Sequence, residues 1–131
     1  GTPDFVDIAA LSSCLDFLER VGIDNIAAHE HELLEWTTAE MQKIPGMRIF
    51  GTTPGKCAVI SFLMGNAHHY DTGMLLDKLG VAVRTGHHCA QPLMESLGIE
   101  GTVRASFGLY NTREEAEAFV AALHRIAPML M

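Results

Sequence analysis

A nearly unbroken apolar run from Ala58 to Met64 restricts the fold more than any other feature of the sequence. The run is far too short to cross a membrane, and the turn-forming residues 52–55 precede it. A strand that is apolar on both faces is typical of the centre of a sheet covered on both sides. We therefore expect a central strand over 58–64, with a short strand over 47–50 before the turn.

Two further strands are predicted closer to the C-terminus. Residues 103–109 alternate strictly, so the apolar positions would face the core while Arg104 falls on the opposite face. The apolar residues 81–83 predict a strand that ends at Arg84. Because side chains in a strand alternate between the two faces, Arg84 would point away from the face of the valines. Both arginines are thus expected on the side of the sheet that does not face the core.

Helices are predicted before, between and after these strands. The first follows Pro3 and ends at Gly22, and the second takes Asp24 as its N-cap and ends before Pro45. Helical spacing and end signals predict three more: one through 74–79, a short one over 92–97, and one that opens on a capping-box pattern at 112–115. The whole chain, 1–131, is therefore expected to be a single small α+β domain, a mostly antiparallel sheet with helices packed on one face.

Composition and charge exclude several classes of protein. The formal net charge is -7 and no basic stripe is present, so nucleic acid is not an expected partner. The first residues form no signal peptide, and a start without Met suggests a piece of a longer protein. Three scattered cysteines argue against a disulfide framework, so we expect a cytoplasmic protein with no membrane partner. A hydrophobic content of 48% fits either a helix-rich domain or a surface covered by another domain or subunit.

The segment from Arg84 to Pro92 is a small basic island that holds Cys89. A thiolate beside Arg, and beside His when it is protonated, is the setting that makes a cysteine a nucleophile. The alternative is a partly buried cysteine that packs as a small hydrophobic residue. For Cys14 and Cys57, which lie in apolar runs, we favour that alternative.

The adjacent His87 and His88 allow three interpretations. They could give acid–base help and stabilise the thiolate, or they could be ordinary hydrogen-bonded loop residues. They could also join Cys89 with His68 and His69 in a zinc site, but structural zinc sites use short paired spacings that this chain lacks. We therefore expect no metal site and treat His87 and His88 as accessory candidates.

Arg84 and Arg104 would repel each other near one thiol unless an anion lies beside them. The planar guanidinium of arginine suits a carboxylate bidentately, which points to an acidic or amino-acid substrate. An ordinary salt bridge to one of the 16 acidic residues is the alternative.

Several motifs resemble the C-terminal part of cysteine desulfurases, in the SufS-like (group II) branch of the pyridoxal-phosphate-dependent class-V aminotransferase family. Selenocysteine lyase activity is also associated with that branch. The resemblance covers essentially the whole chain. It is carried by Gly1-Thr2-Pro3, Arg84-Thr85-Gly86-His87-His88-Cys89-Ala90-Gln91-Pro92-Leu93-Met94, Arg104-Ala105-Ser106 and Tyr110-Asn111-Thr112-Arg113-Glu114-Glu115.

The resemblance implies roles for individual residues. Cys89 matches the nucleophile that takes sulfur from a cofactor-bound cysteine as a persulfide and so releases alanine. Arg104 matches the arginine that pairs with the substrate α-carboxylate, and Arg84 matches an arginine at the entrance of the same pocket. Thr2 matches a residue that reaches the phosphate of pyridoxal 5'-phosphate across a dimer interface.

One departure from the family concerns the cofactor. Such enzymes need a Schiff-base lysine, and Lys43, Lys56 and Lys78 occupy no matching motif. The resemblance therefore implies that 1–131 is the small C-terminal domain of a fold-type I enzyme, without its large cofactor-binding domain. No cofactor is expected on this chain covalently, and the fragment alone should be inactive. The full-length form would be a homodimer that passes sulfur to an acceptor protein of Fe–S cluster assembly.

A second hypothesis comes from another functional class. The chain could be a stand-alone persulfide carrier or a protein-interaction module that receives sulfur on Cys89 from a separate protein, since it lacks a cofactor-binding lysine.

Overall fold

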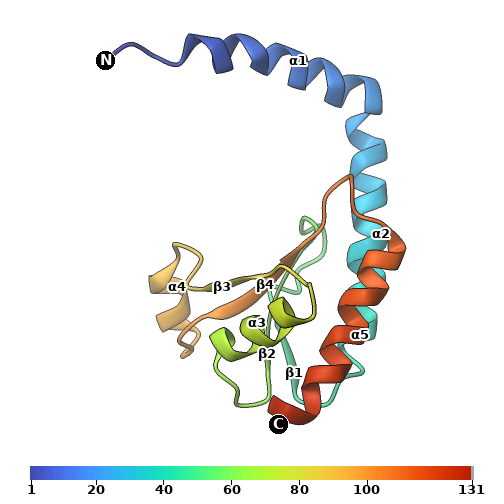
Figure 1. Cartoon of the computed structure of the whole chain (residues 1–131), viewed down its shortest axis with the longest axis vertical. Helices are drawn as coiled ribbons and strands as arrows, with labels where there is room; N and C mark the ends of the chain where they lie inside the picture. The colour runs from blue at the N-terminus through green and yellow to red at the C-terminus, as the bar shows by residue number, and fades with distance from the viewer. Residues whose placement is uncertain (131) are drawn as a thin grey trace.

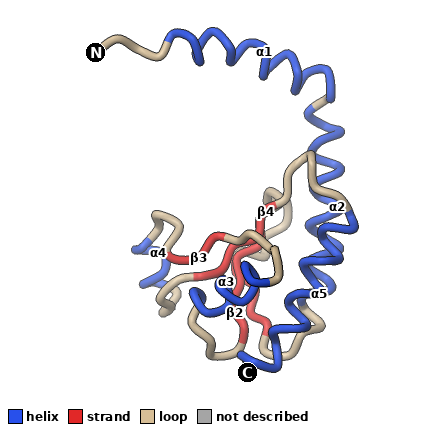
Figure 2. Tube along the Cα trace, in the orientation of Figure 1, coloured by secondary structure: helices blue, strands red, loops and turns tan. Residues whose placement is uncertain are grey.

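The computed structural model describes residues 1–130 and contains five helices and four strands in the predicted order. Figures 1 and 2 show them arranged as a small sheet flanked by helices, with the first helix extending away from it. The elements are α1 (Phe5–Val21), α2 (Ile23–Met41), β1 (Met47–Phe50), β2 (Val59–Met64), α3 (His69–Lys78), β3 (Arg84–Gly86), α4 (Gln91–Ser96), β4 (Thr102–Ser106) and α5 (Arg113–Leu130).

The sheet has the strand order β1-β2-β4-β3, and every neighbouring pair is antiparallel. The predicted α+β architecture is confirmed, and β2 is central, as expected from its apolar run. Ile60, Phe62 and Met64 of β2 are fully buried, together with Val103 of β4. These side chains form one core with buried residues of α2, α3 and α5, among them Met41, Leu76, Leu123 and Ile126.

The other face of the sheet is only partly covered. Val59 and Ser61 alternate with the buried positions of β2 and are half-buried, whereas Leu63 is buried. The expectation that β2 is covered on both faces is therefore met only toward its end at Met64. Helices pack on one face, which leaves room for polar side chains on the other.

The strand boundaries differ from the predictions at two places. β3 covers Arg84–Gly86 and not 81–84, because the partly buried valines before it pack against the core without joining the ladder. β4 ends at Ser106, so the alternation that continues to Leu109 lies beyond the strand.

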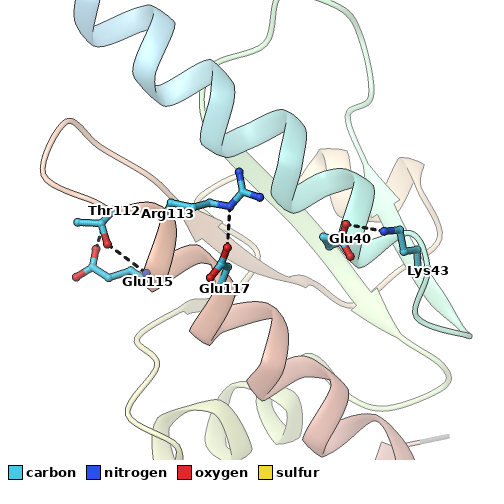
Figure 3. A network of polar contacts seen from close by, with 6 residues as sticks. All are labelled: Glu40, Lys43, Thr112, Arg113, Glu115 and Glu117. Carbon is cyan, nitrogen blue, oxygen red and sulfur yellow. Dashed lines mark hydrogen bonds and ion pairs between the residues drawn. The ribbon is translucent and has the colours of Figure 1, made fainter.

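The helix ends also differ in one case. The N-cap of α2 is Gly22, at φ 90°, and it makes no side-chain cap hydrogen bond, so the assignment of Asp24 as N-cap is wrong. At α5 the capping box is confirmed: Glu115 N donates to Thr112 Oγ1 at 3.3 Å, and Thr112 N donates to Glu115 Oε2 at 3.0 Å (Figure 3).

The predicted first helix is confirmed as α1, but none of its residues is buried. Its apolar stripe is open to solvent, with Ile8 63%, Leu11 55% and Leu15 53% exposed. Figure 1 shows α1 projecting from the end of α2, away from the sheet. Within residues 1–130, no helix is both long and apolar enough to cross a membrane.

Candidate functional site

Strand pairing brings the two candidate arginines together. Arg84 of β3 is the register partner of Arg104 of β4, and Ser61 of β2 lies on the other side of Arg104. Arg84 is exposed between the half-buried Val83 and Thr85, and Arg104 is half-buried between Val103 and Ala105, which are buried in the core. Both arginines therefore leave the core face, as the period-two pattern predicted.

Cys89 lies in the loop between β3 and α4, within reach of Arg84. The side chain is exposed, and Arg84 Nη2 donates to its Sγ at 3.7 Å. His88 and Cys89 both have left-handed backbone conformations, at φ 55° and 59°, which non-glycine residues adopt at a cost of about 1–3 kcal/mol each. The loop thus presents a solvent-accessible thiol beside a cation, on a strained backbone of the kind found at functional sites.

Arg104 has no acidic partner among residues 1–130, where the ion pairs involve other side chains. Its Nε is buried and makes no hydrogen bond. The alternative of an ordinary salt bridge is therefore not what the structure shows for this residue. An unmatched guanidinium on the open face of the sheet is suited to bind a carboxylate.

His88 turns inward and contacts β4. Its Nε2 lies 3.1 Å from the backbone oxygen of Thr102 and 2.9 Å from the Oγ1 of the same residue. Burial lowers the pKa of His88 below 6.5, the Thr102 carbonyl opposes this, and Arg104, Arg84 and His87 lower it further by repulsion. The lowered pKa favours the neutral form of the imidazole at pH 7.

His87 lines a hollow on the surface together with His68 and His69. His68 Nε2 lies 3.3 Å from Glu100 Oε2, and its Nδ1 accepts a hydrogen bond from the backbone N–H of Tyr70. Burial, followed by repulsion from His68, lowers the pKa of His69. In the described part of the chain, no three His, Cys, Asp or Glu side chains are grouped to hold a metal ion.

The remaining predicted residues lie apart from the loop. Thr2 is exposed in the segment ahead of α1, and Figure 1 shows that this N-terminal segment continues from the end of α1 that lies away from the sheet. Cys14 and Cys57 are exposed, so the prediction that they pack as small hydrophobic residues is wrong. For Cys14 the apolar neighbours did not imply burial, because α1 buries no residue against the core. Cys57 lies outside the strand, in the connection before β2.

The lysines do not provide a Schiff-base site. Lys43, just after α2, is paired with Glu40 at 2.5 Å (Figure 3), Lys56 lies in the β1–β2 connection, and Lys78 is the last residue of α3. The three lysines therefore lie outside the segments that carry Cys89, Arg84 and Arg104.

Sequence reasoning missed Thr102, the partner of His88. Thr102 is 1% exposed and pairs with Gly86 across β3 and β4. No local pattern marks it, because its proximity to the cysteine loop results from the strand register. The signal that could have found it was the expected position of β4 beside β3.

Comparisons with known proteins agree with this architecture. The family model described as aminotransferase class-V matches residues 1–119. A probable cysteine desulfurase of Xylella fastidiosa strain Temecula1 is 48% identical over 130 residues, which is 99% of this chain and 31% of that protein. A cysteine desulfurase of Synechococcus elongatus is 45% identical over 126 residues, 96% of this chain and 20% of that protein.

Two solved structures resemble the chain closely. The apo cysteine desulfurase of Thermococcus onnurineus NA1 superposes with a TM-score of 0.93 at 36% identity, over 99% of this chain and 33% of that one. The cysteine desulfurase CsdA of Escherichia coli, in an S-sulfonic acid form, gives 0.91 at 34% identity, over 100% and 32%. The chain spans about a third or less of the length of the proteins it matches. Since the family model covers most of its residues, the chain belongs to the class-V aminotransferase family.

Proposed function

We propose that this chain is the small domain of a cysteine desulfurase and supplies the thiol that accepts sulfur. The observation that carries the proposal is the contact of Arg84 Nη2 with Cys89 Sγ, beside an Arg104 whose buried Nε has no hydrogen-bond partner among residues 1–130. The names of relatives that are 40–48% identical support it. The whole protein would convert L-cysteine to L-alanine.

The sulfur transfer needs no oxidant or reductant other than the Cys89 thiol and the bound cysteine. The Cys89 thiolate attacks the sulfur of the bound cysteine, the carbon–sulfur bond breaks, and a sulfur–sulfur bond forms. The substrate carbon is reduced and takes a proton, which gives alanine, while Cys89 is oxidised to a persulfide. Arg84 favours this step because a neighbouring cation stabilises the attacking thiolate.

Arg104 would hold the substrate by its α-carboxylate. A guanidinium can donate two parallel hydrogen bonds to a carboxylate, which fixes both the position and the direction of the amino acid. The register pairing with Arg84 then sets how far the bound substrate lies from the cysteine loop. Positioning of this kind is a large part of enzymatic rate enhancement.

The cofactor, pyridoxal 5'-phosphate, would be held by a large domain outside this chain, because no lysine here fits its attachment. Thr2 would approach the cofactor phosphate in a homodimer of the complete protein, as the family resemblance implies. The isolated chain would consequently release no alanine from cysteine.

The biological setting is also proposed from the resemblance. We place the complete protein among SufS-like desulfurases of the cytoplasm, which pass their persulfide sulfur to an acceptor protein for Fe–S cluster assembly. Selenocysteine is the alternative substrate, because selenium and sulfur would be transferred to the same thiol.

The test uses the complete protein that contains this segment, loaded with pyridoxal phosphate and supplied with cysteine and a thiol reductant. We expect one alanine per sulfide, loss of turnover in Cys89→Ser, and normal turnover in Cys57→Ser and Cys14→Ser. The isolated chain should release no alanine above the background of free pyridoxal phosphate. Normal turnover in Cys89→Ser would refute the proposal.

A second candidate function is a persulfide carrier that receives sulfur from a separate desulfurase. The exposed thiol of Cys89, on a chain without a cofactor-binding lysine, favours it. Mass spectrometry after incubation with an active desulfurase and cysteine should then show one added sulfur atom on Cys89. Equal loading of the Cys89→Ser variant would contradict this function.

A further inference from the structure

The side chain of His88 ties the cysteine loop to strand β4. His88 Nε2 contacts both the backbone oxygen and the Oγ1 of Thr102, at 3.1 and 2.9 Å. Thr102 is almost fully buried and belongs to the β3–β4 ladder, where it pairs with Gly86. The anchor point of the loop is therefore a rigid part of the core and not another loop.

The contact bears on the tautomer of the ring. A carbonyl oxygen only accepts hydrogen bonds, so the approach of Nε2 to the Thr102 carbonyl favours the tautomer in which Nε2 carries the hydrogen and donates it. In the neutral ring Nδ1 then has a free lone pair, and this atom is buried without a partner. A proton on Nδ1 would be buried without an acceptor, and it would add a third positive charge near Arg84 and Arg104.

The anchor holds a backbone that would otherwise relax. His88 and Cys89 are both left-handed, a conformation that persists in non-glycine residues only where surrounding contacts enforce it. The two residues that flank this pair are bonded to each other: Ala90 N donates to His87 O at 3.0 Å and closes the turn. The His88–Thr102 bond is the link from this turn to the sheet, and the resulting direction of the chain brings Cys89 Sγ to Arg84.

We propose that His88 is a positioning residue for sulfur transfer, which holds the Cys89 thiol at Arg84 by donating Nε2–H to Thr102. The proposal rests on the proposed function for its catalytic consequence, while the hydrogen bond itself is a property of this chain. In this role His88 transfers no proton. His87, which faces the hollow with His68 and His69, has no part in the anchor.

The first experiment tests the anchor in this chain and needs no enzymatic activity. The ¹⁵N chemical shifts of the His88 ring at pH 7 should show a neutral ring with the hydrogen on Nε2. Amide hydrogen exchange of residues 87–90 should be faster in His88→Phe, which keeps a ring without a donor, and near wild type in His88→Gln. A hydrogen on Nδ1, or equal exchange in His88→Phe and wild type, would overturn the anchor.

The second experiment measures turnover in the complete cofactor-loaded protein. For His88→Phe we expect kcat to fall roughly 10- to 100-fold with little change in KM, because a misplaced nucleophile slows the chemical step and not substrate binding. Glutamine can donate an N–H but transfers no proton, so His88→Gln should recover most of kcat. The matched control is His124→Ala, an exposed histidine of α5, with unchanged kcat.

The outcomes separate the possible failures. Equal loss in His88→Gln and His88→Phe, with both variants folded by circular dichroism, would assign acid–base chemistry to His88 and overturn the positioning role. Full activity of His88→Phe would overturn it as well. If the wild-type protein releases no alanine, the proposed function fails, whereas the ring shifts and the exchange rates still decide the anchor.

Discussion

Arg84 and Arg104 are direct register partners on antiparallel strands, yet within the described residues 1–130 only Arg84 has a polar side-chain partner, the thiol of Cys89. Like charges placed opposite each other in a sheet destabilise it, and the buried Nε of Arg104 adds an unmet hydrogen-bond donor. This arrangement is unfavourable for the fold and favourable for binding an anion. It is the kind of conflict expected at a functional site.

Replacing Arg104 should therefore separate stability from function. In Arg104→Met we expect the free energy of unfolding to rise by about 1 kcal/mol, because the like-charge pair and the unmet donor disappear. The turnover of the complete protein should fall by roughly 100-fold or more, because the substrate carboxylate loses its partner. Urea denaturation and alanine release measure the two effects.

Arg48→Met is the matched control for stability. Arg48 is an exposed arginine of β1, and its replacement should change the unfolding free energy by no more than about 0.5 kcal/mol. A clear loss of stability in Arg104→Met would contradict the interpretation of Arg104 as an unmatched charge.

Arg84 should control the reactivity of Cys89. In Arg84→Gln, alkylation of Cys89 by iodoacetamide at pH 7 should slow by roughly two- to fivefold, because a cation near the sulfur no longer stabilises the thiolate. The effect should shrink at about 1 M salt, where exposed charges are screened. Cys57 in the same molecule is an internal control, and mass spectrometry follows both thiols. An unchanged rate ratio would show that the contact has no electrostatic effect.

The lowered pKa of His88 makes stability depend on pH in a defined direction. Burial and the nearby charges of Arg104, Arg84 and His87 lower this pKa in the folded state, so the unfolded chain takes up the proton more readily. The folded state is thus fully favoured above about pH 6.5 and loses stability as the pH falls below that value.

Unfolding titrations of wild type and His88→Gln between pH 8 and pH 5 test this dependence. The loss of unfolding free energy toward pH 5 should be smaller in His88→Gln. A residual loss should remain, since the pKa of His69 is also lowered by burial and by His68. Parallel curves for the two proteins would show that His88 does not contribute.

The capping box should contribute measurably to the stability of α5. Thr112→Ala removes the acceptor for Glu115 N and should destabilise the protein by about 1 kcal/mol in urea denaturation. Thr53→Ala, in the exposed β1–β2 connection, is the control and should stay within about 0.5 kcal/mol of wild type. Equal stability of the two variants would mean that the cap is replaced by water.

Local signals explain which structural predictions succeeded. The bounds of β1 and the capping box of α5 depend on residues that are close together in the sequence, and both were confirmed. The start of β3 was wrong, because Val81 and Val83 pack against the core before the hydrogen-bonded ladder begins at Arg84. Burial and strand pairing give similar sequence patterns, so the pattern alone does not separate them.

The candidate site was predicted as far as neighbours in sequence and strand alternation allow. Cys89 and Arg84 are five residues apart, and alternation placed Arg104 on the same open face. The sequence could not predict that His88 contacts Thr102 while His87 lines the hollow beside α3 and α4, because these contacts depend on residues distant in the sequence. The tertiary fold brings both Thr102 and the residues of the hollow next to the cysteine loop.

The exposed stripe of α1 has a consequence for folding. An isolated helix of 17 residues is only marginally stable in water, because most helical stability in proteins comes from packing of an apolar face. Since α1 buries no residue, its helicity in the free chain depends on local propensity and on its end at Gly22. A surface that covers Leu11 and Leu15 would at the same time complete the folding of α1, so that association and helix formation become one coupled equilibrium.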